Sequence, residues 1–393
     1  MKGKKRHEFF YIMGWHLLHR LLARKFNFDY DNIKVEYSPY IVVANHLTNW
    51  DPLLAGLSFR KPMYYVASDH ILRKGFISKL LKFAVSPIAR VKTAQETQTV
   101  ISIFRRLKEN CNICIFAEGA TSFDGETGEM QPSIGKLIKR SGVALVTYRF
   151  KGSYLTFPRW ARFPHRGKMQ GRLVQIYSPE KIASMSEEEI YIAVKNDIYI
   201  NAYDEQEKNP IAFKGKKTAE CLETVLYCCP KCRLFGTLKS RGDILSCTCG
   251  FKVRYNEYCY FEIPESGERP PFKTIFDWVK WERNEIKNLA QRETESDIPV
   301  TEDDDQELYE IIRASKSALV AKGKLCMYRD RLSVIAESGE KYEFALDKII
   351  DMSVITMKTI VFAVEHKIFE IHSKRPRSAL KYTDMHKIFS TKK

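Results

Sequence analysis

Short apolar runs alternate with helical patterns through the first half of the chain. The apolar runs are rich in β-branched and aromatic residues and are bounded by proline or polar clusters, which is typical of buried strands. Strands that alternate with helices predict an α/β fold with a mainly parallel sheet flanked by helices. The predicted strands lie within residues 38–46, 63–68, 86–90, 111–116 and 143–150, and the predicted helices at 51–60, 71–84 and 97–108.

The chain begins with a basic, amphipathic segment. Its most apolar part, FFYIMGWHLLHRLL at Phe9–Leu22, is interrupted by His16, His19 and Arg20 and has basic residues on both sides. It falls short of the ~18–20 apolar residues that span a bilayer. Such a helix can lie in a membrane interface, or it can pack on the domain as an ordinary amphipathic helix. The start of the chain lacks a clean apolar core and cleavage site, so we do not expect a secreted protein.

The pattern changes in the second half of the chain. Residues 215–262 combine a cysteine cluster with short strands, and the acidic run Thr301–Glu307 is predicted to be a linker. The last segment alternates apolar and polar side chains over several short runs and closes with a helix at Ser378–Ile388, which is typical of a small β-barrel or sandwich. It loosely resembles a pleckstrin-homology-like module. The predicted domains are 1–205, 215–262, a helical linker at 270–300, and 308–393.

Composition fits a soluble, globular protein of two or three domains, with 393 residues, 44% of them hydrophobic and 28% charged. The net charge of +16 lies entirely in the first half of the chain. Residues 1–180 carry 29 Lys and Arg against 13 Asp and Glu, whereas residues 181–393 carry 35 of each. We therefore expect the first half to meet an anionic partner, and phosphate-bearing ligands, anionic lipid and nucleic acid all satisfy that condition.

One histidine stands directly after a predicted strand, in the stretch ANHLTNWDP. His46 therefore lies at the carboxyl end of a strand, where open α/β sheets place their active sites. Asp51 precedes Pro52, the favoured order for a helix N-cap and the first helical residue. A carboxylate at that place could also hold the imidazole Nδ1–H and leave Nε2 free to take a proton. The stretch alone fits a general base with its orienting partner or a turn residue and a cap, but the two roles are compatible, and we expect Asp51 to be both cap and orienter.

A second polar stretch, FAEGATSFDGETGEM at Phe116–Met130, also follows a predicted strand. Its Glu118-Gly119 turn precedes small hydroxyl residues. Backbone N–H groups exposed at such a turn suit a phosphate or hydroxyl ligand. Taken alone, the stretch is equally well explained as a glycine-rich loop with an acidic face.

Together the two stretches resemble the glycerolipid acyltransferases, and most closely the bacterial-type 1-acylglycerol-3-phosphate acyltransferase family. A strand ending in NHxxxxD is followed about 70 residues later by a strand ending in FxEG and small hydroxyl residues. Phe83–Glu96 resembles the second sequence block of the family. The aromatic and basic run that begins at Val143 resembles the block after the glutamate. The resemblance covers about residues 5–200.

The resemblance implies transfer of a fatty acyl group from a thioester, acyl-CoA or acyl carrier protein, to the free hydroxyl of a lysophospholipid. The expected acceptor is 1-acylglycerol-3-phosphate, which gives phosphatidic acid. His46 would be the general base and Asp51 its orienting partner, and the activated thioester requires no enzyme nucleophile. The substrate-binding residues that the family motifs imply are Arg90 for the phosphate, and Glu118, Gly119, Thr121 and Ser122 for the rest of the acceptor head.

One position departs from the family pattern. The family's fourth motif commonly reads EG, then Thr or Asn, then Arg-Ser, and its arginine contacts phosphate. Here Thr121 stands in the place of that arginine. Either the acceptor is not a simple phosphomonoester, or another cation compensates. The candidates are Arg90, Arg149, Lys151 and Arg159.

The cysteines form a second specific pattern. CCPKC and CTCG give a C-x2-C pair, a 14-residue gap and a C-x-C pair, which is typical of a tetrahedral structural zinc site. We assign Cys229, Cys232, Cys247 and Cys249 as ligands, with Cys228 as a possible substitute for Cys229. A zinc ribbon would staple a segment with little apolar content, and a closed four-cysteine site leaves no position for catalysis. Cys111 and Cys114 are expected to be buried structural thiols in a strand.

Two other classes of function fit the sequence. A zinc ribbon in a basic chain suits a nucleic-acid-binding protein, but the ribbon carries no dense basic patch, so we expect no nucleic-acid partner. A non-catalytic scaffold that binds membrane lipid through its C-terminal module also fits. The favoured interpretation is an enzyme bound peripherally, as a monotopic protein, at the cytoplasmic face of the cell membrane.

Overall fold

The computed structural model describes residues 2–68, 86–90, 96–264, 267–292, 297–313 and 316–390. The predicted helix at 71–84 lies outside these residues. The chain forms two compact units. Unit 1 comprises Met1–Arg159 and Pro164–Lys214, and unit 2 comprises Trp160–Phe163 and Gly215–Lys393.

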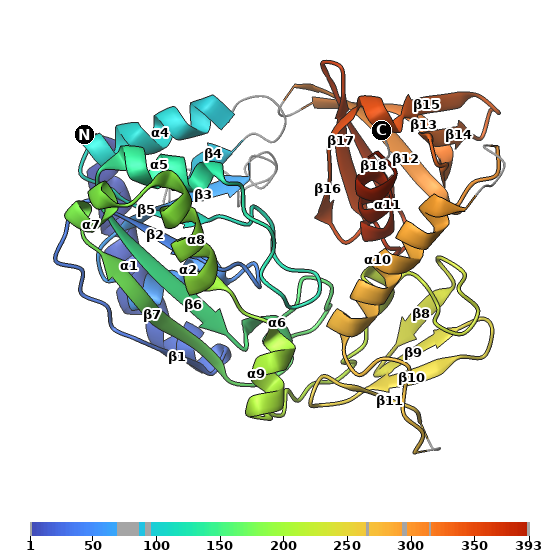
Figure 1. The fold of residues 1–393 in the computed structure, drawn as a ribbon, viewed down its shortest axis with the longest axis horizontal. Helices are drawn as coiled ribbons and strands as arrows, with labels where there is room; N and C mark the ends of the chain where they lie inside the picture. Colours follow the sequence, from blue (N-terminus) through green and yellow to red (C-terminus); the bar gives the residue numbers. More distant parts are fainter. Residues whose placement is uncertain are drawn as a thin grey trace. The chain divides into compact units, whose positions relative to one another are not determined.

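Unit 1 contains a seven-stranded sheet in the order β1-β7-β6-β2-β5-β3-β4 (Figure 1). Strand β2 pairs in parallel with β5 and β6, β3 with β4 and β5, and β1 with β7, whereas β6 and β7 are antiparallel. The predicted α/β class with a mainly parallel sheet is confirmed, and the predicted strands are present. The strands are β1 Phe28–Tyr30, β2 Tyr40–Ala44, β3 Met63–Ser68, β4 Ile88–Arg90, β5 Asn112–Phe116, β6 Ala144–Lys151 and β7 Met169–Tyr177.

Helices cover both faces of this sheet, so its central strands are buried on both sides. That burial explains why β2 and β5 are continuous apolar runs rather than alternating ones. Alternate residues such as Ile41 and Val43 join one large core with α4, α5, α7 and α8. The helices are α1 Lys2–Lys25, α2 Asp51–Ser58, α4 Glu96–Lys108, α5 Ser133–Ser141, α6 Ser153–Thr156, α7 Pro179–Ser184, α8 Glu187–Ile198 and α9 Ala202–Lys208.

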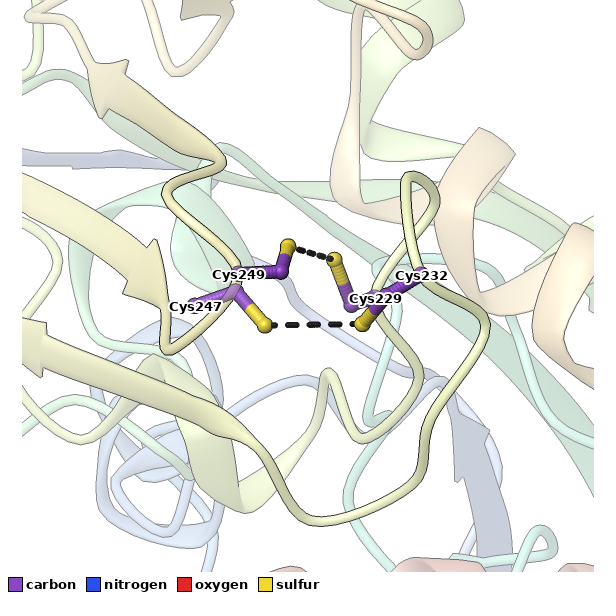
Figure 2. Close-up of side chains that lie close together, drawn as sticks. All are labelled: Cys229, Cys232, Cys247 and Cys249. Atoms are coloured by element: carbon purple, nitrogen blue, oxygen red, sulfur yellow. Dashed lines mark hydrogen bonds between the residues drawn. The ribbon is translucent and has the colours of Figure 1, made fainter.

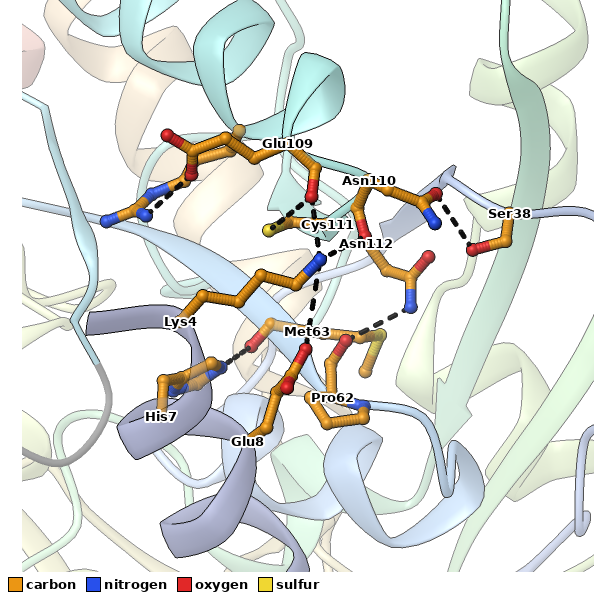
Figure 3. Close-up of polar contacts among 11 residues, drawn as sticks. Lys4, His7, Glu8, Ser38, Pro62, Met63, Glu109, Asn110, Cys111 and Asn112 are labelled. Atoms are coloured by element: carbon orange, nitrogen blue, oxygen red, sulfur yellow. Dashed lines mark hydrogen bonds and ion pairs between the residues drawn. The ribbon is translucent and has the colours of Figure 1, made fainter. Parts of the chain in front are cut away.

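The N-terminal helix α1 is fixed to unit 1 by polar contacts along one of its faces. Near its start, Lys4 Nζ donates to the carbonyl oxygen of Glu109 at 2.7 Å, and His7 Nε2 lies 3.1 Å from the Met63 carbonyl oxygen (Figure 3). Further along the same face, the Tyr11 hydroxyl donates to the Phe59 carbonyl at 3.0 Å. The residues that dock recur every three or four positions, which is the repeat of one helix face.

Unit 2 contains two antiparallel sheets and two long helices, α10 Ile275–Gln291 and α11 Leu380–Ser390. The smaller sheet has the order β11-β10-β9-β8, and the larger has the order β15-β14-β13-β12-β18-β17-β16. The strands of the smaller sheet are β8 Leu238–Arg241, β9 Ile244–Cys247, β10 Lys252–Tyr255 and β11 Phe261–Glu262. Those of the larger are β12 Thr301–Arg313, β13 Lys316–Met327, β14 Arg331–Ala336, β15 Lys341–Ala345, β16 Ile349–Thr356, β17 Thr359–Val364 and β18 Lys367–Ser373, and the short 3₁₀ turns of the unit are η2 Leu222–Thr224 and η3 Leu346–Lys348.

The prediction of a linker at Thr301–Glu307 is wrong, because this acidic run is the first half of β12. Lysines on the neighbouring strand β13 form ion pairs with acidic side chains of this run. Lys324 Nζ lies 2.8 Å from the Glu302 carboxylate, and Lys322 Nζ lies 3.2 Å from the Glu307 carboxylate. Cross-strand pairs of this kind favour pairing of strands that would otherwise repel or stay solvated. The acidic composition alone could not reveal partners 15 to 22 residues away along the chain.

Candidate active site

The sheet register brings the two polar stretches of unit 1 to the same edge. Ala44, the last residue of β2, pairs with Phe116, the last residue of β5. His46 and Glu118 each follow two residues later, and the His46 backbone N–H donates to Glu118 Oε1 at 2.6 Å. The His46 imidazole stacks on the Phe116 ring with 4.4 Å between centroids. Two residues that are 72 positions apart therefore become direct neighbours.

The side chains of His46 and Asp51 form a hydrogen-bonded pair. His46 Nδ1 lies 3.1 Å from Asp51 Oδ2, and the same oxygen accepts the backbone N–H groups of Leu47 and Thr48 at 2.6 and 2.8 Å. Asp51 is fully buried, whereas the His46 side chain keeps 17% of its surface exposed. The carboxylate thus fixes the tautomer and direction of the ring, and Nε2 is left as the nitrogen that can take a proton.

The prediction that Asp51 caps helix α2 is wrong. Trp50 occupies the N-cap position, and no side chain caps the helix. The Asp51 carboxylate faces backwards and accepts from residues that precede it in the chain rather than from helical N–H groups. Burial raises the pKa of the Asp51 carboxyl, and the hydrogen bonds from His46, Thr48 and Leu47 oppose that rise.

Glu118 holds two loops of the site together. Its Oε1 accepts from His46, and its Oε2 accepts the Gly128 backbone N–H at 2.5 Å. Burial raises the pKa of Glu118 to about 8, although both backbone donors favour the ionised carboxylate. These contacts are structural in themselves, and binding of the acceptor head by Glu118 stays a prediction.

Arg90 and the turn after β5 also meet. Arg90 is the last residue of β4, and its guanidinium covers Gly119 so closely that a Cβ atom there would collide with it. Gly119 also has φ +73°, a conformation that favours glycine. Glycine at this position therefore permits both the turn and the approach of the arginine.

The hydroxyl residues of the motif complete the cluster. The Ser122 backbone N–H donates to the His46 carbonyl oxygen at 2.9 Å, and the Ser122 hydroxyl accepts from Gly125 N–H at 2.9 Å. Thr121 is buried beside it, and its carbonyl oxygen accepts Arg159 Nη1 at 3.1 Å. The structure therefore brings together all seven residues that the sequence predicted for this site. They are His46, Asp51, Arg90, Glu118, Gly119, Thr121 and Ser122.

One positioning residue was missed by the sequence analysis. Asn45 is fully buried, and its amide both donates to the Phe150 carbonyl at 3.0 Å and accepts the Phe150 N–H at 2.8 Å. These bonds fix the chain next to His46 onto strand β6. An asparagine at the end of a fully apolar run was the available signal, since a buried amide must find partners.

Part of unit 1 matches a known protein family. Residues 26–151 match the family model described as Acyltransferase. The chain contains an acyltransferase domain. The predicted acyltransferase family is thus confirmed for the part of unit 1 that carries the His46 cluster.

None of the curated proteins matches the chain. Among solved structures, the chain is similar to the 1-acyl-sn-glycerophosphate (LPA) acyltransferase PlsC from Thermotoga maritima, with 18% sequence identity and a TM-score of 0.42. That match covers 50% of this chain and 80% of the other.

Beyond the acyltransferase domain, unit 2 carries the predicted cysteine cluster. The Sγ atoms of Cys229, Cys232, Cys247 and Cys249 all lie within 4.8 Å of one another. Figure 2 shows them facing each other from two loops, with 3.7 Å between Cys229 and Cys249 and between Cys232 and Cys247. Four thiolates about 2.3 Å from a tetrahedral zinc ion would be roughly 3.8 Å apart. The donor set and its dimensions therefore fit zinc.

Helix α10 holds the first cysteine loop through hydrogen bonds to its backbone. The buried Glu282 carboxylate accepts the backbone N–H groups of Tyr227 and Cys228 at 2.6 and 2.7 Å, and Trp278 Nε1 donates to the Cys228 carbonyl at 3.0 Å. The Cys228 thiol instead donates to the Arg233 carbonyl at 3.5 Å. Cys229, rather than Cys228, is thus the residue of this loop that joins the cluster with Cys232.

Proposed function

We propose that the acyltransferase domain moves a fatty acyl group from a thioester donor to the free hydroxyl of a lysophospholipid, with His46 as general base. The preferred acceptor is 1-acylglycerol-3-phosphate, and the product is phosphatidic acid. The observation that carries the proposal is the buried Asp51 carboxylate at 3.1 Å from His46 Nδ1, beside the arginine and hydroxyl residues of the β5 turn.

The chemistry needs only the groups of this site and its two substrates. His46 Nε2 takes the proton of the acceptor hydroxyl as the oxygen attacks the thioester carbonyl carbon. The C–S bond then breaks, and the leaving thiolate receives the proton from the imidazolium. Asp51 stabilises that transient cation through Nδ1–H. The donor carrier is either coenzyme A or acyl carrier protein, and both supply the same thioester.

The proposed reaction is tested by supplying a radiolabelled acyl thioester with a panel of lysolipids presented on vesicles. We expect labelled diacyl product from 1-acylglycerol-3-phosphate, and slower or no labelling of lysolipids with bulkier head groups. Both donor carriers are included as separate arms. Absence of product from every donor and acceptor pair would contradict acyl transfer to lysolipids.

We also propose that helix α1 binds a membrane surface at the cytoplasmic face, so that the protein is peripheral and monotopic. One face of α1 docks on unit 1 through His7, Tyr11 and Trp15. The opposite face is apolar but exposed, with 62% to 64% exposure at Phe9, Leu17 and Leu21. A continuous exposed apolar stripe flanked by lysines and arginines suits the lipid interface. Among the described residues, no helix is long and apolar enough to cross a bilayer.

Replacement of Leu17 and Leu21 together by glutamate is expected to weaken binding to anionic vesicles by roughly 100-fold or more. The reason is that each buried leucine contributes about 1.5–3 kcal/mol to transfer from water. Vesicle co-sedimentation gives the partition coefficient. Leu234→Glu, at a 58% exposed leucine of unit 2, is the matched control and should bind like wild type. Equal partitioning of all three proteins would reject α1 as the membrane contact.

For unit 2, we propose that Cys229, Cys232, Cys247 and Cys249 hold one structural Zn²⁺ ion in a zinc ribbon. The sulfur spacing and the absence of any other residue from this four-thiol group, within the described chain, support a closed site. Two knuckles joined by the β8–β9 hairpin are the usual setting of such a ribbon. The larger antiparallel sheet with its closing helix α11 is proposed to be a pleckstrin-homology-like module.

A further inference from the structure

The acyltransferase domain lacks a cation at the position of Thr121, where the family motif places a phosphate-binding arginine. Two of the four basic residues that could compensate are committed elsewhere. Arg149 donates through Nε and Nη2 to the carbonyls of Asp197 and Asn196, at the end of helix α8. Lys151 forms an ion pair of 2.7 Å with Glu205. Arg149 therefore binds the carbonyl groups at the end of α8, and Lys151 binds Glu205, so neither side chain is directed to the site.

The remaining two basic residues both contact the motif turn. The Arg90 guanidinium lies against Gly119. The Arg159 guanidinium donates to the Thr121 carbonyl at 3.1 Å and lies over the Phe123 ring, with 3.8 Å from Cζ to the ring centroid. The same turn is bonded to His46 through Ser122 N–H.

The path of the chain explains how Arg159 reaches this place. Strand β6 ends at Lys151, on the same edge of the sheet as the ends of β2 and β5. The short helix α6 follows and ends at Thr156, three residues before Arg159. The segment that follows β6, two strands from β5 in the sheet, thus brings Arg159 to the backbone of Thr121, the position of the motif arginine.

We propose that Arg159 replaces the missing motif arginine and, together with Arg90, binds the phosphate group of the acceptor. The inference rests on the proposed function and names the residue that selects a phosphate-bearing acceptor. Stacking on Phe123 occupies the flat face of the guanidinium, and its N–H donors lie in the plane, as bidentate phosphate binding requires. Burial lowers the pKa of Arg159 only to about 10, so the side chain is a cation at neutral pH.

The experiment compares Arg159→Gln with wild type on two acceptors that differ only in the phosphate: 1-acylglycerol-3-phosphate and 1-acylglycerol with the same acyl chain. Loss of a charge-assisted hydrogen bond to phosphate is expected to raise KM for the first about 10- to 100-fold. The kcat/KM for the second should stay within about 3-fold of wild type, because that acceptor has no phosphate to lose. Arg159→Lys keeps the charge without the planar donor pair. Its KM for 1-acylglycerol-3-phosphate should lie between those of wild type and Arg159→Gln.

Two additions separate phosphate binding from a purely structural bond to Thr121. Thr121→Arg combined with Arg159→Gln restores the family arrangement and is expected to recover the KM for the phosphate-bearing acceptor. Arg149→Gln is the matched control, at an arginine whose partners are carbonyls of α8, and should not change the ratio of the two acceptors. Equal losses on both acceptors with Arg159→Gln, or no loss on either, would overturn the inference.

A binding measurement keeps the inference testable if turnover fails. Calorimetric titration of glycerol 3-phosphate into wild type should give an affinity at least 10-fold tighter than into Arg159→Gln, and equal affinities would overturn the role of Arg159 regardless of activity. If wild type transfers acyl groups but prefers the acceptor without phosphate, acyl transfer stands and the role of Arg159 is rejected. If wild type transfers to no acceptor, the proposed function fails while the titration still decides on Arg159.

Discussion

Replacement of His46 by alanine is expected to reduce the rate of acyl transfer by roughly 10²–10⁴-fold, the usual contribution of a general base. The acceptor hydroxyl then has no group to take its proton as it attacks the thioester. The fold should survive, because the His46 bonds to Glu118 and Ser122 use its backbone, which alanine retains. Initial rates with a labelled acyl thioester measure the loss, and thermal unfolding checks the fold.

Two other variants define what the His46 result means. Asp51→Asn should also lower the rate strongly, since an amide cannot serve as the single anionic acceptor for the imidazole and two backbone N–H groups. His366→Ala, at an exposed histidine in the turn between β17 and β18, is the matched control and should be as active as wild type. More than a tenth of the wild-type rate in His46→Ala would contradict the general-base role.

Removal of one cysteine of the cluster is expected to release the metal and unfold part of unit 2. Freshly purified, reduced wild type should contain about one zinc ion per chain, and Cys229→Ser well under half of that. Binding of structural zinc contributes roughly 10–16 kcal/mol in small zinc-binding peptides. This is as large as the whole free energy of unfolding of a typical domain, about 5–15 kcal/mol, so loss of the metal should unfold the ribbon. Elemental analysis and the unfolding transition of unit 2, with and without a strong chelator, measure both effects.

Cys228, the residue next to Cys229, provides the matched control for this experiment. Cys228→Ser should keep the zinc, because the Cys228 thiol donates to the Arg233 carbonyl and a serine hydroxyl can do the same. Wild type without metal would reject the zinc ribbon. Equal metal loss in Cys228→Ser and Cys229→Ser would contradict the assignment of Cys229 as the ligand.

The sequence by itself determined the five strands β2 to β6 of unit 1 and the polar residues that follow β2 and β5. The apolar runs of β2 and β5 predicted strands correctly. Both faces of these strands are buried, so nearly every residue in them is apolar, and this can be seen in the local sequence. The spacing of His46 and Asp51 was equally informative, since five residues at the end of a strand bring the two side chains within 3.1 Å. The cysteine spacing likewise predicted which four thiols lie close together.

What the tertiary structure decided depends on residues that are distant in sequence. The bonds between His46 and Glu118, and between Arg159 and Thr121, join positions 72 and 38 residues apart, and only the parallel register and the path of the chain after β6 bring them together. The acidic run of β12 became a strand for the same reason, since its lysine partners belong to another strand. Local pattern fixes which side chains are buried or exposed, whereas the choice among four possible cations required knowing what each one already binds.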